Sequence, residues 1–333
     1  MAIKADICVF AHDEAAGIAA MVAGLRLQDL SGIDARIVIL ANGCTDDTAA
    51  LARAAAAGSV VDVVELAEGG KSRSWNRFVH GIARPDAEVL VFADADIRLP
   101  APDCLSRLIR GLVARPALWA LNSQPVKDIV AVPQQLSLTD RLIAAAGGGL
   151  DDWKTAICGQ LYAMPAARAR RFHLPVGLPV EDGFLRAMVL TDALTGPEDF
   201  SRIDGLEGLA HIYESERSIG RLIRHQERIV IGSAINAAAF AALRDLPPED
   251  RAEELATAAR DDGWLPSVIA ARLPAAPGGY VPLHFLTKRL MRAFTRPLQA
   301  RRLAVALPGF AFDLIVYLRA QYRMAKGAGA GFW

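Results

Sequence analysis

The sequence lacks three features that would define simple classes of protein: closely spaced cysteines, net charge and long apolar runs. Its four cysteines (Cys8, Cys44, Cys104 and Cys158) lie far apart in 333 residues and form no C-x-x-C pair, which argues against a zinc ribbon or a disulfide scaffold. We interpret them as small buried side chains in a reducing compartment. Lysine plus arginine and aspartate plus glutamate both number 37, so overall charge gives no reason to expect nucleic-acid binding.

No segment is expected to be a signal peptide or to cross a membrane. The acidic residues Asp13 and Glu14 interrupt any apolar run at the N-terminus. The strongest membrane-like run, residues 303–318, is 16 residues long and contains Pro308 and Asp313. A span needs about 18 apolar residues or more, so this run is too short.

Charge is distributed unevenly along the chain. Residues 280–333 contain nine basic residues and a single acidic one, a net charge of +8, so residues 1–279 carry −8. We expect this segment to dock on an anionic membrane, which places the protein in the cytoplasm, peripheral on the inner face of the cell membrane. The alternative is that its helices cover the rest of the protein and present their arginines to its negative surface. The apolar residues expected to enter the headgroup boundary are Leu286, Leu290, Phe294, Leu303, Phe310, Phe312, Tyr317, Phe332 and Trp333.

Apolar strands and amphipathic helices alternate over the first 95 residues. Strands are predicted at 6–10, 35–40, 60–66 and 88–93, each followed by a helical or turn pattern. This alternation is typical of an α/β sheet with helices on both faces. Beyond residue 205 the pattern is almost wholly helical, and we place a soft boundary near 235. The predicted domains are therefore 1–235 and a helical C-terminal region, 236–333, basic from 280.

Three polar clusters follow the predicted strands, at 11–14, 42–47 and 94–96. Ligands of open α/β sheets bind outside the carboxyl ends of the strands. Asp94 and Asp96 are two carboxylates at the end of an apolar strand, where Mg²⁺ or Mn²⁺ would compensate them and hold a diphosphate. Taken alone, such a D-x-D pattern is more often a solvated turn.

In this order, the motifs resemble the family 2 glycosyltransferases of the GT-A fold over roughly residues 5–235. The matching segments are Asp13-Glu14, Asn42-Gly43-Cys44-Thr45-Asp46, Gly70-Lys71 through Asn76, Asp94-Ala95-Asp96, the segment 157–164 and Glu181-Asp182. The resemblance implies a GT-A-type, Rossmann-like mixed sheet flanked by helices, with a C-terminal helical extension. It also implies an inverting, metal-assisted transfer of a sugar from a nucleoside-diphosphate sugar to a hydroxyl of a lipid, lipid-linked or glycan acceptor.

Candidate site residues follow from these motifs and from isolated residues further along the chain. Asp182 is expected to be the general base, with Glu181 pointing elsewhere if the segment is extended. A helix N-terminus with two acids is the alternative for this pair. The other candidates are Ala11, Glu14, Asn42, Lys71, Asp94 and Ala95 for the nucleotide sugar, Asp96, Asp94 and His211 for the metal, and Gly159, Gln160, His225 and Arg228 for acceptor or phosphate.

Two departures from the family's pattern affect these expectations. Asn42 or Ala41 stands where the family has an acid that reads the nucleobase. The Gln-x-x-Arg-Trp motif of processive members has only a degenerate match at 225–229, so we expect a non-processive enzyme. A nucleotidylyltransferase of related architecture and a catalytically inactive sugar-nucleotide-binding protein remain alternatives. The former usually has a basic, Gly-rich loop after the first strand, and the segment 11–14 is acidic.

Overall fold

The computed structural model describes residues 2–131, 152–216, 218–275, 279–287, 291 and 300–331, with the backbone alone described at 300–307. Its strands are β1 (Ile3–Ala11), β2 (Ile33–Asn42), β3 (Val61–Leu66), β4 (Val89–Asp94), β5 (Ile97–Arg98), β6 (Ala120–Lys127), β7 (Leu161–Pro165) and β8 (Ile203–Tyr213). Its helices are α1 (Ile18–Arg26), α2 (Thr48–Ala56), α3 (Lys71–Arg77), the π-helical turn Phe78–Ile82, α4 (Cys104–Val113), α5 (Asp128–Ala131), α7 (Ala166–Ala169), α8 (Glu181–Thr191), the 3₁₀ turn Phe200–Arg202, α9 (Ile219–Arg244), α10 (Arg251–Ala258), α11 (Trp264–Arg272) and α13 (Ala300–Ala325).

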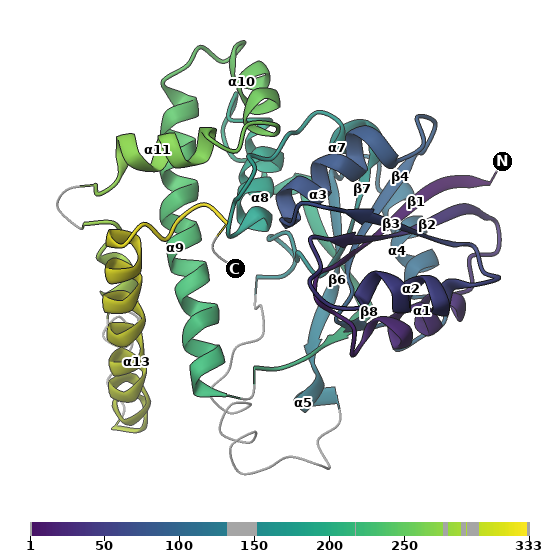
Figure 1. The fold of residues 1–333 in the computed structure, drawn as a ribbon, viewed down its shortest axis with the longest axis horizontal. Helices are drawn as coiled ribbons and strands as arrows, with labels where there is room; N and C mark the ends of the chain where they lie inside the picture. Colours follow the sequence, from purple (N-terminus) through teal and green to yellow (C-terminus); the bar gives the residue numbers. More distant parts are fainter. Residues whose placement is uncertain are drawn as a thin grey trace.

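The strands form one mixed sheet in the order β3-β2-β1-β4-β7-β6-β8-β5. The first four neighbours are parallel, whereas β7 runs antiparallel to β4 and to β6. The four strands predicted from the apolar runs correspond to β1, β2, β3 and β4. The expected mixed sheet with flanking helices is confirmed (Figure 1).

Both faces of the sheet are covered, and β1 shows how the sequence divides between them. Successive side chains of a strand point to opposite faces. Cys8 and Phe10 belong to one hydrophobic core, whereas Ile7 and Val9 belong to the other. Because every residue from Ile7 to Ala11 is buried, this part of the strand is apolar throughout rather than alternating.

The segment Ile203–Tyr213 corrects the expectation that the chain is helical beyond residue 205. It forms β8, which pairs in parallel with β6. Its buried residues at 203, 205, 209 and 211 recur with the period of two that a strand requires. Two glycines and a glutamate interrupt the apolar signal in this segment, which explains why the pattern was not recognisable as a strand.

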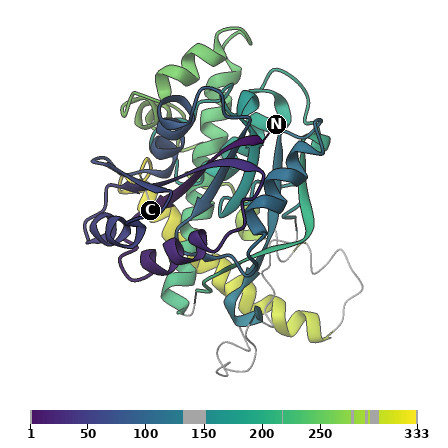
Figure 2. The same ribbon diagram turned by 90° about the vertical axis from the view of Figure 1, so that its right-hand side faces the viewer.

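The helical C-terminal region lies to one side of the sheet (Figures 1 and 2). Helix α9 is the long central helix of this region. Residue 235, the expected domain boundary, lies inside α9, so one uninterrupted helix crosses that position. The division of the chain into two domains stays a prediction. Helices α11 and α13 both pack against α9. No helix among the described residues has the length and apolar character needed to span a bilayer.

A buried carboxylate holds α13 against α9. Glu227 is fully buried and forms ion pairs with Arg319 and with Arg323, whose Nε lies 3.1 Å from Glu227 Oε2. Phe312 and Tyr317, expected in a membrane interface, are partly buried and pack against the core, and membrane docking stays a prediction. Part of the basic segment therefore serves to attach α13 to the protein. Several residues of the expected docking segment lie outside the described part of the chain: Lys288, Arg289, Leu290, Arg292, Phe294, Arg296, Phe332 and Trp333.

Candidate functional site

The register of the central strands brings the polar clusters together at one edge of the sheet. Ala11, the last residue of β1, is opposite Ala41 of β2, and Phe10 is opposite Asp94 of β4. The three strands are parallel neighbours, so the loops after them meet. The backbone N–H of Ala95 donates to the carbonyl of Phe10 (3.0 Å), which fixes the D-x-D turn against β1.

The side chain of Asn42 is buried and holds three segments of this edge in place. Its Nδ2 donates to the carbonyl of Ala11 (2.8 Å), and its Oδ1 accepts from the backbone N–H of Gly70 (3.1 Å). Its own carbonyl meets His12 Nδ1 at 2.8 Å. With both ends of its amide engaged inside the fold, Asn42 sets the position of the loop before Lys71, and a contact between Asn42 and the nucleotide stays a prediction.

Lys71, the first residue of α3, lies at the centre of the site. Its Nζ is 2.5 Å from Asp94 Oδ1 and 3.4 Å from Glu181 Oε1, and it donates to the carbonyl of Gly159 (3.0 Å). Burial opposes the charge on Lys71, but the carboxylates of Asp94 and Glu181 outweigh burial and raise its pKa. Lys71 is therefore a buried cation between two acidic motifs that are 87 positions apart in the sequence, and not a solvated surface lysine.

Glu181 and Asp182 form the first turn of α8. This corrects the expectation that Glu181 points elsewhere, which assumed an extended segment. In the first turn of a helix both acids lie next to the free backbone N–H groups, where negative charge is stabilised. Glu181 pairs with Lys71, while Asp182 accepts a hydrogen bond from the N–H of Gly183 (2.7 Å).

Glycines and one asparagine set the position of α8. A Cβ on Gly159 would lie 3.3 Å from Asp182 Oδ2, and one on Gly232 of α9 would lie 2.4 Å from a methyl of Val180. Asn236 of α9 donates to the carbonyl of Val180 (2.9 Å). These close approaches let α9 support the start of α8 directly behind the two acids.

Asp182 has the electrostatic properties of a proton acceptor that works near neutral pH. Its pKa is raised to about 6, chiefly by burial and also by the charge of Glu181, while Lys71, the N–H of Gly183 and Arg228 act in the opposite direction. Arg228 on α9 therefore acts on the charge of Asp182, and a contact between Arg228 and substrate stays a prediction. Its neighbour Glu227 lies on another face of α9 and pairs with α13.

A group of carboxylates beside the D-x-D motif is short of positive charge. The pKa of Glu14 is raised to about 7, chiefly by burial and then by the charges of Asp96, Asp94, Glu214 and Asp46. Burial likewise raises the pKa of Asp94 to about 6, against the influence of Lys71. Glu214 directly follows β8, and no pattern in the sequence marked it as a site residue because that strand was not predicted.

These carboxylates fit a divalent cation better than His211 does. Carboxylate oxygens are the ligands that Mg²⁺ and Mn²⁺ prefer, and their mutual repulsion is what a cation would relieve. His211 is fully buried on β8, and its ring nitrogens meet Ser123 Oγ and Gln160 Oε1. Burial lowers the pKa of His211 to about 4. Within the described part of the chain no ion pair joins His211 to an acid, so its role as a ligand stays a prediction.

Gln160 links His211 to the D-x-D motif. Its side chain contacts His211, and its backbone carbonyl accepts from the N–H of Asp94 (2.9 Å). His225 lies on α9, and burial lowers its pKa, with Arg228 and Lys127 acting in the same direction. The structure therefore gathers Gly159, Gln160 and Arg228 around the acids, whereas a contact between His225 and substrate stays a prediction.

The first half of the chain is similar to a known protein family. Residues 6–160 match the model of the glycosyl transferase family 2. A mannosyltransferase from Pyrobaculum calidifontis, solved with GDP-Man and Mn²⁺, matches with a TM-score of 0.54 and 18% identity over 97% of this chain and 88% of its own. Glucosyl-3-phosphoglycerate synthase from Mycobacterium tuberculosis matches with a TM-score of 0.47 and 20% identity over 74% of this chain and 81% of its own. No curated protein sequence matches the chain. At these identities the first likeness establishes a common fold, and the expected GT-A architecture is confirmed.

Proposed function

We propose that the protein transfers a sugar from a nucleoside-diphosphate sugar to a hydroxyl of a lipid, lipid-linked or glycan acceptor, because residues 6–160 match the model of the glycosyl transferase family 2. We further propose that the transfer inverts the anomeric centre, uses Mg²⁺ or Mn²⁺ and adds one sugar per encounter. The observation that carries this proposal is the position of Asp182, which lies beside Gly159 and the Lys71–Asp94 ion pair at the carboxyl edge of the sheet.

Asp182 is the proposed general base. An inverting transfer needs a carboxylate that removes the proton of the acceptor hydroxyl on the face opposite the leaving diphosphate. With a pKa of about 6, Asp182 is ionised at neutral pH and is still basic enough to accept that proton. Glu181 is held by Lys71, so it is a positioning residue rather than a second base.

Asp94 and Asp96 would hold the divalent cation, with Glu14 and Glu214 adding negative charge nearby. A bound cation supplies Lewis-acid stabilisation of the leaving diphosphate. Lys71 adds a fixed positive charge on the same side, where it can interact with a phosphate oxygen. The match of fold to an enzyme solved with GDP-Man and Mn²⁺ supports this assignment.

We also propose that the protein works in the cytoplasm at the inner face of the cell membrane, through α13. Ile315, Leu318 and Tyr322 are 47, 57 and 65% exposed, and their spacing places them on one face of that helix. Lys326 lies over the Tyr322 ring at 5.8 Å and extends the face with a cation. This face is available for the headgroup boundary, because the inward face of α13 is occupied by contacts with α9.

A binding and turnover screen tests the enzymatic proposal. The protein is titrated with a panel of nucleotide sugars in the presence of Mn²⁺, and binding and release of nucleoside diphosphate are both measured. We expect Asp96→Ala to lose Mn²⁺-dependent binding, whereas Asp86→Ala, a change of an exposed acid that pairs with Lys4 at the opposite edge of the sheet, should not. Equal binding by Asp96→Ala and the parent protein would contradict the metal assignment.

Vesicle co-sedimentation tests the membrane proposal. We expect binding to anionic phosphatidylglycerol vesicles that weakens with salt and that Leu318→Glu reduces. The matched control is Val113→Glu, because Val113 is an exposed apolar residue of α4 (46%) and not of α13. If the parent protein does not bind anionic vesicles, the docking proposal is refuted and the enzymatic proposal is unaffected.

A further inference from the structure

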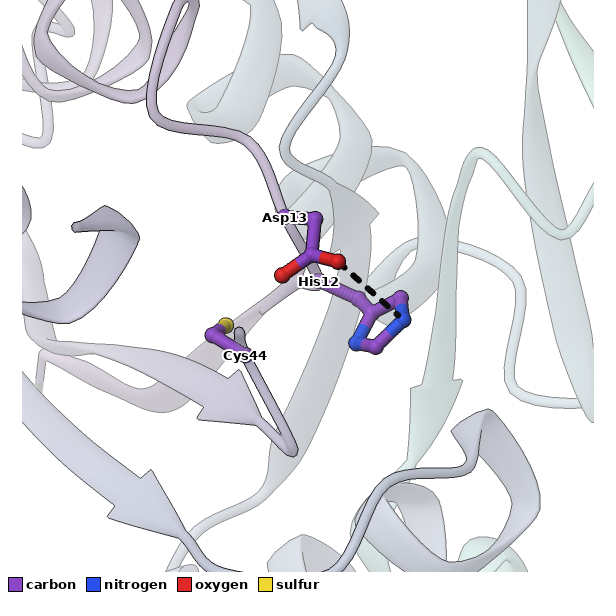
Figure 3. A group of neighbouring side chains, drawn as sticks. All are labelled: His12, Asp13 and Cys44. Carbon is purple, nitrogen blue, oxygen red and sulfur yellow. Dashed lines mark ion pairs between the residues drawn. The ribbon is translucent and has the colours of Figure 1, made fainter. Parts of the chain in front are cut away.

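Three side chains that the proposed reaction does not use meet at the ends of β1 and β2. His12, Asp13 and Cys44 each offer one ligand atom, and these atoms lie within 4.8 Å of one another. Figure 3 shows the Asp13 carboxylate between the His12 ring and the Cys44 thiol. We propose that this cluster is a second metal site, selective for Zn²⁺ over the magnesium-type cation assigned to Asp94 and Asp96.

The fold fixes the tautomer of His12 in the form that a metal needs. A carbonyl oxygen only accepts, so His12 Nδ1 carries the proton that it donates to the Asn42 carbonyl at 2.8 Å. The lone pair of the neutral ring is then on Nε2, which lies 4.0 Å from Asp13 Oδ2. Metal-binding histidines commonly donate their other N–H to a carbonyl or carboxylate in this way.

Asp13 is held as an ionised ligand in an unusual backbone conformation. Its φ is +53°, a region that residues other than glycine rarely adopt. Its two carboxylate oxygens accept from the N–H (2.6 Å) and the hydroxyl (3.0 Å) of Thr45. The hydrogen bond from the Thr45 N–H lowers the pKa of Asp13, and the hydroxyl bond adds to this.

Cys44 differs from the other cysteines because it is only half-buried, whereas Cys8, Cys104 and Cys158 are buried. Its Sγ lies 3.6 Å from the Ala11 carbonyl, a weak thiol contact that leaves the sulfur open to a ligand. The sequence-based view of all four cysteines as buried hydrophobes is therefore wrong for Cys44.

The ligand set and its spacing point to Zn²⁺. Zinc takes nitrogen, sulfur and oxygen ligands together in a tetrahedron, whereas Mg²⁺ and Mn²⁺ prefer oxygen. At ligand distances of about 2.0–2.3 Å, two ligand atoms of a tetrahedron are about 3.5 Å apart. The three atoms here need to approach by about 1 Å, which side-chain rotation provides. Binding displaces the thiol proton of Cys44 to solvent and leaves the Nδ1 proton of His12 in place.

The zinc site lies where it would affect the proposed reaction. Only this effect on the reaction rests on the proposed function. The cluster adjoins Ala11 and Asn42, at the edge of the sheet where we place the donor nucleotide. Zinc there would compete with the donor and inhibit the enzyme. The experiment below uses protein without nucleotide, so its failure leaves the glycosyltransferase proposal untouched.

Metal titration of the full chain tests the site, with Zn²⁺ followed by calorimetry and Co²⁺ by absorption, both in excess Mg²⁺. We expect one Zn²⁺ to bind with release of about one proton, and Co²⁺ to give a cobalt–thiolate charge-transfer band. Cys44→Ser and Asp13→Asn should weaken Zn²⁺ binding by more than about 100-fold. Asparagine tolerates a positive φ, so Asp13→Asn retains the backbone while it removes the charge.

Cys104→Ser is the matched control, because it changes a thiol on α4 and should leave the cobalt band intact. Circular dichroism confirms that each variant is folded. A cobalt band that persists in Cys44→Ser, or Zn²⁺ affinity that Asp13→Asn leaves unchanged, overturns the proposal. Displacement of Zn²⁺ by Mg²⁺ would also overturn it, since the ligand set would then not be selective.

Discussion

Replacing Lys71 by methionine tests whether this residue is the resident cation of the site. Its Nζ lies 2.5 Å from Asp94 and 3.4 Å from Glu181, and the Lys71 and Asp94 side chains are each only 23% exposed. Removing one partner of a buried ion pair costs about 3–5 kcal/mol of unfolding free energy. The remaining contact with water places the expected loss at the lower end, about 3 kcal/mol near pH 8.

The loss of unfolding free energy in Lys71→Met should depend on pH. The pKa values of the neighbouring carboxyl groups decide whether the loss grows or shrinks as pH rises. The pKa of Asp94 and that of Asp182 are raised to about 6 from 3.8, so the folded state binds their protons more tightly than the unfolded state does. Ionising them as pH rises from about 4 to 6 therefore lowers stability already in the parent protein. Without Lys71, the cost of ionising Asp94 in the folded state is larger above pH 6. Near pH 5 Asp94 is largely protonated, so removing Lys71 changes the unfolding free energy little. We expect a difference of about 1 kcal/mol or less at pH 5.

Urea unfolding of the parent and Lys71→Met at about pH 5 and pH 8, without divalent metal, measures this difference. Metal is left out because a bound cation would replace the missing charge. Lys154→Met is the control: Lys154 pairs with Glu207 on the surface, with side-chain exposures of 44 and 79%, and exposed pairs contribute about 1 kcal/mol at most. Equal losses at both pH values would refute the reasoning, because they would assign the effect to lysine packing rather than to charge.

Three further predictions concern single residues of the site and of its support. Asp182→Asn should lower turnover by about 10²–10⁴ in steady-state assays while donor binding persists, and the parent's turnover should rise with pH through about 6; near-normal turnover would place the base elsewhere. Glu227→Gln should lower the unfolding free energy in urea by about 1–2 kcal/mol, because it removes a charged hydrogen-bond partner of Arg319 and Arg323 but leaves Arg319 half exposed to water, and an unchanged midpoint would contradict this. Asn42→Asp should cost about 1–3 kcal/mol by thermal or urea unfolding, because a carboxylate cannot donate to the Ala11 carbonyl; a more stable variant would show that the loop rearranges.

Local patterns in the sequence determined the first half of the fold and the location of the site. The inner strands β1, β2 and β4 are largely apolar on both faces because both faces are covered, and this produces the continuous runs that predict them. The D-x-D motif was recognisable because two acids directly after such a run require a compensating charge. Glu181 and Asp182 were recognisable as a pair, but their secondary structure was not.

Tertiary structure decided what depends on contacts between distant segments. The ion pairs of Lys71 join residues 71, 94 and 181, and no local pattern reports a pairing over such separations. The role of Asn42 as a clamp requires the Ala11 carbonyl and the Gly70 N–H to converge on one amide, which only the sheet register and the loop after β3 bring about. The +8 charge of residues 280–333 was plain in the sequence, yet only the packing of α13 on α9 shows that Arg319 and Arg323 face a buried Glu227. Composition determines how many charges a segment carries; the direction in which each one points depends on the partner that the fold places opposite it.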